Sequence, residues 1–299
     1  MMLRTVVAAL GTAALAACSA VPQSDPPQRS AQAQPAPAPT PTLAPLPPAK
    51  FAYAGKITQG GWLRGLAPAG TTALTFDGTP VPLADDGNFL LAFDRDSGPS
   101  GILVATRSDG TTAREALTIS PRDWRIERVN IARRTGGASE SFMAIRRPEL
   151  AKIVAARAND TGATGWKQDF IWPARGRISG VFGSQRIYRG EPGSYHSGID
   201  IAPGAGVPFV SPADGVVVLA EPDFSLEGRL IIIDHGMGLN SAFLHAQRID
   251  VSVGDRVRQG QQLGLIGSSG RATGPHLHWS LKWNDARLDP LLFTGPMGE

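Results

Sequence analysis

Cysteine is nearly absent from this sequence, whose 299 residues include only Cys18. A single cysteine excludes a disulfide-stabilised scaffold and a zinc finger with cysteine ligands, so any zinc site must use histidine, aspartate or glutamate. Long apolar runs are also missing, because the only uncharged one, residues 6–17, is shorter than the ~20 residues of a membrane-spanning helix. The sequence is therefore not that of a polytopic membrane protein.

Strong charge of either sign is lacking as well. The formal net charge is +3, and the basic residues do not form the concentrated face that nucleic-acid binding requires, so we expect no nucleic-acid partner. The hydrophobic share of 42% is large enough for folded cores. The length corresponds to about two domains of ~100–200 residues each.

Residues 1–18 have the features of an export signal. A basic residue, Arg4, precedes an apolar stretch that ends in small residues, as in secretory signals. Residues 15–18 (LAAC) resemble the lipobox of bacterial lipoproteins, in which the cysteine becomes the lipidated first residue. An ordinary signal peptide is the alternative, but the only cysteine lies where a lipobox requires one. Because Ser19 rather than aspartate follows, the resemblance implies a lipid anchor at Cys18 in the outer membrane of a Gram-negative bacterium, on the periplasmic side of the cell envelope.

Residues 19–50 form a proline-rich segment behind this signal. Ten of these thirty-two residues are proline, and alanine, glutamine, serine and threonine make up most of the rest. Such a composition cannot bury enough apolar area to fold and favours extended polyproline II. We expect a disordered tether between the folded part of the chain and its lipid anchor, which would be its only contact with the membrane.

The remaining chain divides into three segments by its pattern. Residues 51–135 alternate short apolar runs with turn residues, which predicts a small β-sandwich-like domain. Residues 136–163 predict a helical connector. Residues 164–299 contain several β-type apolar runs and no amphipathic helix, which predicts a β-rich domain.

The helical prediction covers residues 139–158. An approximate 3.6-residue stripe that would face a core is formed by Phe142, Ile145, Leu150, Ile153 and Val154. Proline is unfavourable inside a helix, so we expect the main helix to start at Pro148, with this proline in its first turn. The basic side chains expected in solvent are Arg146, Arg147, Lys152 and Arg157.

All five histidines lie in the last of these segments, and four of them occur in patterns that suit a metal site. His196 and Asp200 are four residues apart, and His276 and His278 have the spacing at which strand side chains share one face. His245 follows an apolar run. Two imidazoles and one carboxylate would leave a fourth tetrahedral position for water, as in catalytic zinc sites. The two histidines left off the metal could transfer protons or stabilise an oxyanion.

Several motifs around these histidines resemble the lysostaphin/LytM-type zinc peptidases. The resemblance covers roughly residues 172–290 and rests on five segments: 180–183 (GVFG), 196–202 (HSGIDIA), 212–217 (PADGVV), 234–238 (DHGMG) and 270–278 (GRATGPHLH). It implies a mainly β fold in which an antiparallel β peptidase domain, at residues 164–299, surrounds a zinc cleft. The sandwich and the connecting helix would precede this domain. Members of the family cut peptide bonds in peptidoglycan stems or bridges.

The resemblance also implies roles for individual residues. His196, Asp200 and His278 match the zinc ligands, and His245 and His276 match the two catalytic histidines, without indicating which one is the general base. In such a site zinc lowers the pKa of its bound water toward ~7 and polarises the scissile carbonyl. We therefore expect a metalloendopeptidase that hydrolyses peptide cross-links or stems of peptidoglycan through a metal-activated water.

Two other functions remain open. A non-catalytic LytM-type regulator would activate another cell-wall hydrolase without cutting anything, but such regulators typically lack zinc ligands, and here the set is complete. A purely structural lipoprotein would leave the histidines unexplained. Departures from the common family pattern at Phe243 and Ala246 leave the substrate preference open. His235 falls in the family's Asp-His-Gly turn, where a structural role is favoured over a place in the cleft wall.

Overall fold

The computed structural model describes residues 46–132 and 139–298, which fall in one compact unit. Cys18, the rest of the predicted export signal and most of the predicted tether lie outside the described residues, so the lipid anchor stays a prediction. Within the described ranges, no helix is both long and apolar enough to cross a membrane.

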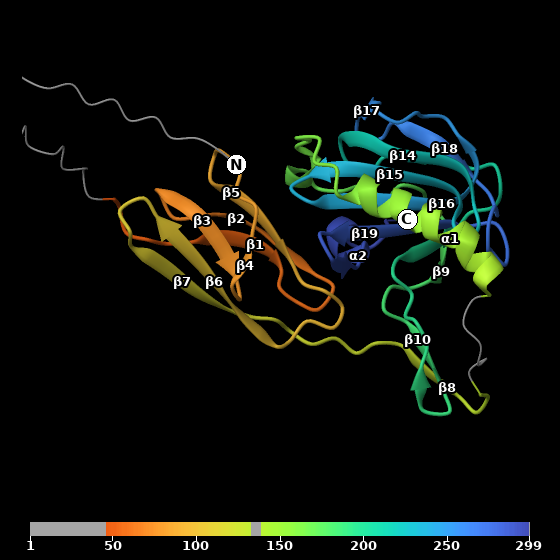
Figure 1. Cartoon of the computed structure of the whole chain (residues 1–299), viewed down its shortest axis with the longest axis horizontal. Helices are drawn as coiled ribbons and strands as arrows, with labels where there is room; N and C mark the ends of the chain where they lie inside the picture. Colours follow the sequence, from red (N-terminus) through yellow and green to blue (C-terminus); the bar gives the residue numbers. More distant parts are fainter. Residues whose placement is uncertain (1–45, 133–138, 299) are drawn as a thin grey trace, which may run out of the picture. The chain divides into compact units, whose positions relative to one another are not determined.

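Two small antiparallel sheets, called the N-terminal sheets, come first in the chain (Figure 1, orange to yellow). Their strand orders are β1-β2-β5 and β4-β3-β6-β7. The strands are β1 Ala52–Lys56, β2 Trp62–Leu66, β3 Thr71–Phe76, β4 Thr79–Pro80, β5 Asn88–Ala92, β6 Ser100–Arg107 and β7 Thr112–Thr118. Alternate residues of β6 are buried, and Leu63, Phe89 and Leu103 are fully buried in a core that draws on both sheets. This alternation is the pattern of a sheet with one face on a core.

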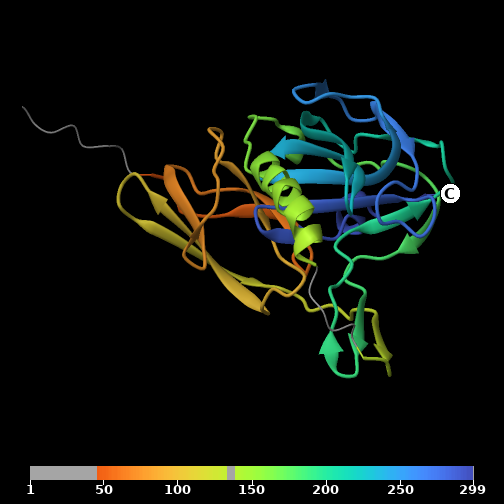
Figure 2. The ribbon, with the colours of Figure 1, turned by 45° about the vertical axis from the view of Figure 1, so that its right-hand side comes forward.

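A ten-stranded antiparallel sheet dominates the later part of the chain (Figures 1 and 2). Its main path runs β17-β14-β15-β16-β19-β12-β9, and β13, β18 and β20 pair beside this path. The strands are β9 Arg177–Gly180, β12 Ile199–Ala202, β13 Pro208–Val210, β14 Gly215–Phe224, β15 Gly228–Gly236, β16 Leu239–Ile249, β17 Arg256–Val257, β18 Gln262–Ile266, β19 Leu277–Trp283 and β20 Ala286–Leu288. Two short helices accompany them, η1 Gly165–Lys167 and α2 Leu291–Thr294.

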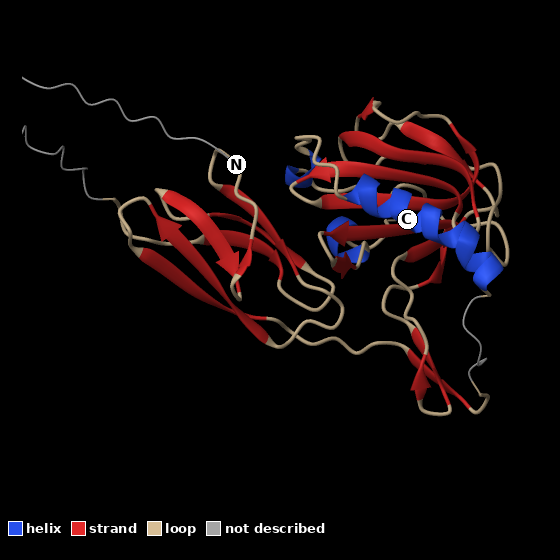
Figure 3. Ribbon diagram, in the orientation of Figure 1, coloured by secondary structure: helices blue, strands red, loops and turns tan. Residues whose placement is uncertain are grey.

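Helix α1, Glu140–Arg157, covers part of one face of this sheet, where it contacts β14 and β15 (Figure 3). Ile231 and Ile233 of β15 belong to the main core, whereas Ile232 packs in a second cluster that includes Ala156 of α1. Apolar residues cover both faces of the strand, which explains why it is a continuous apolar run in the sequence rather than an alternating one.

A third, three-stranded sheet connects the segment before α1 to a later part of the chain. β8 Ile126–Val129 pairs in parallel with β10 Gln185–Tyr188, and β10 pairs antiparallel with β11 Glu191–Pro192. The last strand before the helix therefore joins strands that lie about sixty residues later, rather than the N-terminal sheets. The limits predicted for the five segments of the chain stay predictions.

Helix α1 begins earlier than the sequence predicted. The Ser139 hydroxyl caps it by accepting a hydrogen bond from the Phe142 amide at 3.1 Å, and the helix then runs through Pro148. The expected start at Pro148 is therefore wrong. The cap and the buried ion pairs of Arg146 and Glu149, on either side of the proline, keep the helix intact although Pro148 has no amide hydrogen to donate.

Two of the three buried residues of α1 are charged, which corrects the predicted apolar stripe. Arg146 and Glu149 are each 8% exposed. Of the predicted stripe, Phe142 and Ile153 are half-buried, and the exposed members are Ile145 (57%), Leu150 (40%) and Val154 (66%). Arg157, also expected in solvent, donates a hydrogen bond to Asn240 Oδ1 at 2.6 Å.

The orientation of α1 follows from ion pairs with the turn between β14 and β15. Arg146 donates to both carboxylate oxygens of Glu227 at 2.7 Å and to Glu149 at 2.9 Å. Glu149 in turn accepts hydrogen bonds at 2.6 Å from the amide and the hydroxyl of Ser225. Buried charges must find such partners, and this requirement outweighs the gain from burying a few more aliphatic groups.

Candidate metal centre and active site

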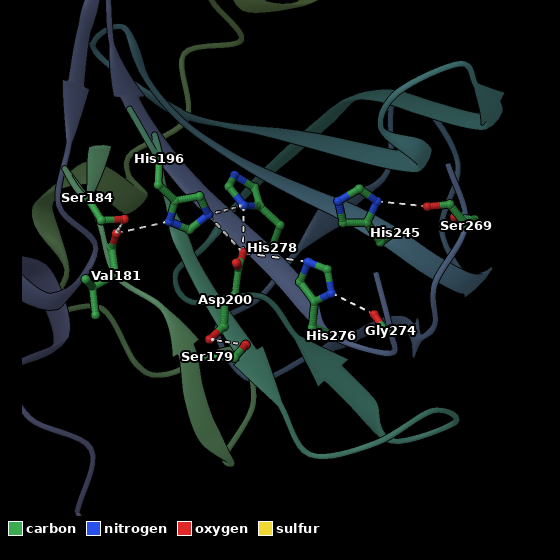
Figure 4. Close-up of polar contacts among 10 residues, drawn as sticks. All are labelled: Ser179, Val181, Ser184, His196, Asp200, His245, Ser269, Gly274, His276 and His278. Atoms are coloured by element: carbon green, nitrogen blue, oxygen red, sulfur yellow. Dashed lines mark hydrogen bonds and ion pairs between the residues drawn. The ribbon is translucent and has the colours of Figure 1, made fainter. Parts of the chain in front are cut away.

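Three potential metal ligands meet on neighbouring strands. Asp200 of β12 lies opposite His278 of β19 in antiparallel register, and His196 stands just ahead of β12. His196 Nε2 is 3.1 Å from both Asp200 Oδ1 and His278 Nδ1, and the latter two atoms are 2.9 Å apart (Figure 4). Gly180 of the adjacent strand β9 leaves the necessary room, since a Cβ there would lie 2.2 Å from Asp200 Oδ2. The sheet thus brings together the three residues that the sequence indicated as ligands.

The chemistry of these donor atoms fits a zinc ion. They lie within 4.8 Å of one another, so one ion can contact all three. Two imidazole nitrogens and one carboxylate oxygen are a donor set of catalytic zinc sites, in which a fourth position stays open. Burial alone would raise the pKa of Asp200, but hydrogen bonds from His196 and His278 outweigh it and hold that pKa well below its usual range. Burial lowers the pKa of His278 and favours its neutral ring, the form that metal binding requires. Burial would also lower the pKa of His196, but the hydrogen bond with Asp200 outweighs it and raises that pKa.

The loop of residues 181–184 fixes the position of His196. The Nδ1 atom donates to the Val181 carbonyl at 3.1 Å, which leaves Nε2 as the atom that can bind a metal. The backbone is held as well: the His196 amide donates to the Ser184 carbonyl, and the Gly183 amide donates to the His196 carbonyl, both at 2.8 Å. Three hydrogen bonds therefore connect one ligand to one short loop.

His245 and His276 stand beside the trio (Figure 4). Their ring centroids are 4.9 Å apart, and the centroid of His245 is 6.4 Å from that of His278. Each ring is anchored through Nδ1, which donates at 2.8 Å to the Ser269 carbonyl in His245 and to the Gly274 carbonyl in His276. This anchoring leaves Nε2 of each ring for proton transfer or hydrogen bonding.

The two histidines differ from the trio in distance and electrostatics. His276 Nε2 is 3.7 Å from Asp200 Oδ1, which is longer than the distances within the trio, so His276 neighbours the trio without belonging to it. Burial lowers the pKa of His245 and favours its neutral ring, the form that can accept a proton. The catalytic roles of His245 and His276 stay predictions.

The fifth histidine, His235, lies in the core. It is fully buried in β15, and its Nδ1 donates to the Asp214 carbonyl at 2.7 Å. Its Nε2 is 2.8 Å from the hydroxyl oxygen of Ser241, which accepts a hydrogen bond from the Trp279 indole at 3.3 Å. Because both ring nitrogens have partners inside the protein, this environment supports the structural role that the sequence favoured.

A cleft of about 1010 Å³ opens beside His196 and Asp200. The third sheet supplies one of its walls, which includes Glu127, Arg186 and Tyr188, and Arg186 donates to Glu127 at 2.7 Å. The sequence did not predict this wall. It depends on a parallel pairing between β8 and β10, and neither two-residue alternation nor turn residues could indicate a pairing between such distant, short strands.

Comparisons with known proteins show what the part of the chain around this site is similar to. Residues 194–290 match Peptidase family M23. Over 109 residues the chain is 38% identical to the peptidoglycan DD-endopeptidase ShyA of Vibrio cholerae, which amounts to 35% of this chain and 24% of that protein. Over 127 residues it is 34% identical to the DD-carboxypeptidase/endopeptidase Mpg of Neisseria meningitidis, which amounts to 41% and 28%. The chain thus spans about a quarter of the length of these two curated relatives.

The crystal structure of a putative peptidase M23 from Pseudomonas aeruginosa is similar over a longer stretch. The TM-score is 0.62 at 29% identity, and the similarity covers 81% of this chain and 96% of that chain. Residues 194–290 of the chain are therefore similar to peptidase family M23. The predicted fold class is confirmed: mainly β, with small N-terminal sheets, a helix and an antiparallel M23 domain.

Proposed function

We propose that this protein is a zinc-dependent endopeptidase that hydrolyses peptide cross-links or stems of peptidoglycan. The observation that carries the proposal is the His196-Asp200-His278 trio, which lies beside two further histidines. His196 and Asp200 of the trio line a cleft. The names of the relatives support the substrate class, since ShyA is a peptidoglycan DD-endopeptidase and Mpg a DD-carboxypeptidase/endopeptidase.

The residues of the site would have different roles according to where they lie. Zinc would be held by His196 Nε2, Asp200 Oδ1 and His278 Nδ1, and when bound it supplies the Lewis acidity that makes water a nucleophile near neutral pH. His245, neutral because it is buried, can accept a proton at Nε2. With its ring protonated, His276 can donate a hydrogen bond from Nε2 to the oxygen on which charge develops, while Nδ1 donates to the Gly274 carbonyl. The proton that His245 accepts can then pass to the nitrogen of the leaving amine, which completes hydrolysis of the peptide bond.

Purified muropeptides test this activity. The full chain, incubated with cross-linked muropeptides, is expected to release smaller products that mass spectrometry identifies. A chelator should abolish the products, and added zinc should restore them. Zinc-loaded protein that leaves all muropeptides intact would contradict the activity and favour the non-catalytic regulator.

We further propose that Cys18 carries a lipid that anchors the protein in the outer membrane, with its folded part on the periplasmic side of the envelope. The support is the LAAC sequence at residues 15–18 and the proline-rich segment behind it. Replacing the cysteine, Cys18→Ser, removes the thiol that would be acylated. The variant should move from the membrane fraction to the soluble fraction or stay unprocessed. Fractionation and processing identical to those of the wild type would contradict the anchor.

A further inference from the structure

One arginine from outside the M23 match holds the loop that positions His196. Arg95 lies between β5 and β6 of the N-terminal sheets and is only 5% exposed. Its guanidinium donates to the Gly183 carbonyl through Nε at 3.2 Å and through Nη2 at 3.0 Å. Nη2 also donates to Gln185 Oε1 at 3.3 Å, and Nη1 donates to Asp96 Oδ1 at 2.6 Å. The buried, positively charged guanidinium of Arg95 thus donates hydrogen bonds to the Gly183 carbonyl in the loop of residues 181–184.

Aromatic rings fix this guanidinium in place. Its central carbon lies 5.0 Å from the ring centroid of Trp124 and 4.6 Å from that of Tyr195, the residue directly before His196. Trp124 also packs on Gly183, where a Cβ would lie 2.2 Å from the indole and where φ is +77°. Stacking on rings and hydrogen bonding in the guanidinium plane are compatible only for arginine among the basic residues.

The contacts continue from Arg95 to the candidate metal ligand. The Gly183 carbonyl is held by Arg95, while the Gly183 amide donates to the His196 carbonyl at 2.8 Å. The next two contacts of His196, through its amide and its Nδ1 atom, end on Ser184 and Val181 of the same loop. A shift of the loop would therefore move both the backbone and the ring of His196.

We propose that Arg95 is a positioning residue for the zinc ligand His196, so that the N-terminal sheets complete the metal site of the M23 domain. The inference rests on the proposed function only in that the trio holds zinc; it does not require the chain to cleave peptidoglycan. Partners that orient metal ligands typically change metal affinity by ~10–100-fold when they are removed. The expected signature of Arg95 is therefore a change in zinc affinity caused by a residue of another part of the fold.

The test compares two equally buried arginines of the N-terminal sheets in the full chain. Arg95→Met removes the donors to the loop. Arg107→Met is the control, because Arg107 is 7% exposed and donates to the Ala69 and Pro47 carbonyls, within the N-terminal part of the chain. Zinc dissociation constants are measured by competition with a chromogenic chelator. We expect Arg95→Met to bind zinc at least ~10-fold more weakly and Arg107→Met to stay within about twofold of the wild type.

Two further readouts separate positioning from general destabilisation. Arg95→Lys keeps the charge but loses the fork and the stacking, so its zinc affinity should fall between wild type and Arg95→Met. If Arg95→Met does not fold, Arg95→Lys carries the test alone, with an affinity several-fold below that of the wild type. The absorption spectrum of the cobalt-substituted Arg95→Lys protein should also differ from that of the wild type, because His196 meets the ion at a changed angle.

Several results would overturn the proposal: wild-type zinc affinity in the Arg95 variants, an equal loss in Arg107→Met, or an unchanged cobalt spectrum. A wild-type chain that binds zinc tightly but cleaves no muropeptide would contradict the proposed activity alone. A wild-type chain that binds no zinc would overturn both proposals.

Discussion

His196 and His245 lie on either side of His278, and the protein supports them in different ways (Figure 4). His196 is held by the loop of residues 181–184, which Arg95 contacts directly. His245 donates its amide to the Glu227 carbonyl at 2.9 Å and has a left-handed backbone with φ of 67°. The carboxylate of the same Glu227 is held by two hydrogen bonds from Arg146 of helix α1.

The two supports share a chemical principle. Each is a buried arginine outside residues 194–290, and each contacts a residue whose backbone is hydrogen-bonded to the backbone of a histidine in the candidate site. Charge-assisted hydrogen bonds are stronger than neutral ones and fix geometry, which makes a buried guanidinium suitable for such a role. The histidines of the candidate site thus lie in the residues that match family M23, whereas the two arginines that help to fix their positions lie outside the match.

The supports also differ in what they should control. Arg95 contacts a loop that is hydrogen-bonded to the ring of His196, a candidate metal ligand. Arg146 instead holds the carboxylate of Glu227, whose carbonyl accepts a hydrogen bond from the amide of His245, the histidine that we propose to lie off the metal. Disturbing the first should change metal binding. Disturbing the second should change turnover while metal binding stays intact.

Among changes near His196, removing one of the candidate zinc ligands should have the largest effect on zinc affinity. His278→Ala leaves two of the three donors, so zinc affinity should fall steeply and activity with it. Elemental analysis of the purified variant should show little zinc beside a wild-type sample with about one ion per chain. Full zinc occupancy in His278→Ala would mean that the ligand set is wrong.

Removing Arg146, which supports His245 through Glu227, should have a smaller effect, and on stability and turnover rather than on zinc affinity. Arg146→Met leaves Glu149 and Glu227 buried without their cation, which should lower the free energy of unfolding by about 3 kcal/mol. Turnover should fall roughly tenfold because His245 loses its fixed position. Zinc affinity should not change.

The neighbouring residue provides a matched control for this prediction. Arg147 pairs with Glu140 at the surface, with its side chain 60% exposed, so Arg147→Met should alter stability by no more than about 0.5 kcal/mol and leave turnover unchanged. If Arg146→Met bound zinc as weakly as Arg95→Met, this would contradict the expectation that only Arg95 affects zinc binding.

The sequence could indicate the residues of the candidate site because much of their pattern is local. His196 and Asp200 are four residues apart in the sequence, and His276 and His278 are two residues apart. These short spacings indicate that the members of each pair lie close together. Their convergence then follows from the register of β12 and β19, which places Asp200 opposite His278. The resemblance to a family assigned which histidines would bind metal, and spacing alone could not.

The supports were not predictable because they depend on long-range pairs. Arg95 and Gly183 are 88 residues apart, and Arg146 and Glu227 are 81 residues apart, with no local pattern that connects them. The aliphatic residues of α1 suggested a core-facing stripe, but a polar contact across the sheet set the orientation of the helix instead. The local hydrophobic pattern of a helix cannot predict a buried ion pair between one of its residues and a residue in a distant turn.

The proposed function requires three residues that hold zinc and two histidines that do not bind it but act in catalysis. Zinc content and muropeptide turnover, measured on the same samples of His245→Ala and His276→Ala, test it most directly. We expect each variant to keep about one zinc per chain and to lose turnover by ~10²–10⁴-fold, the usual cost of removing a positioned acid–base group. A His276→Ala protein without zinc, or either variant with near-normal turnover, would contradict the assignment.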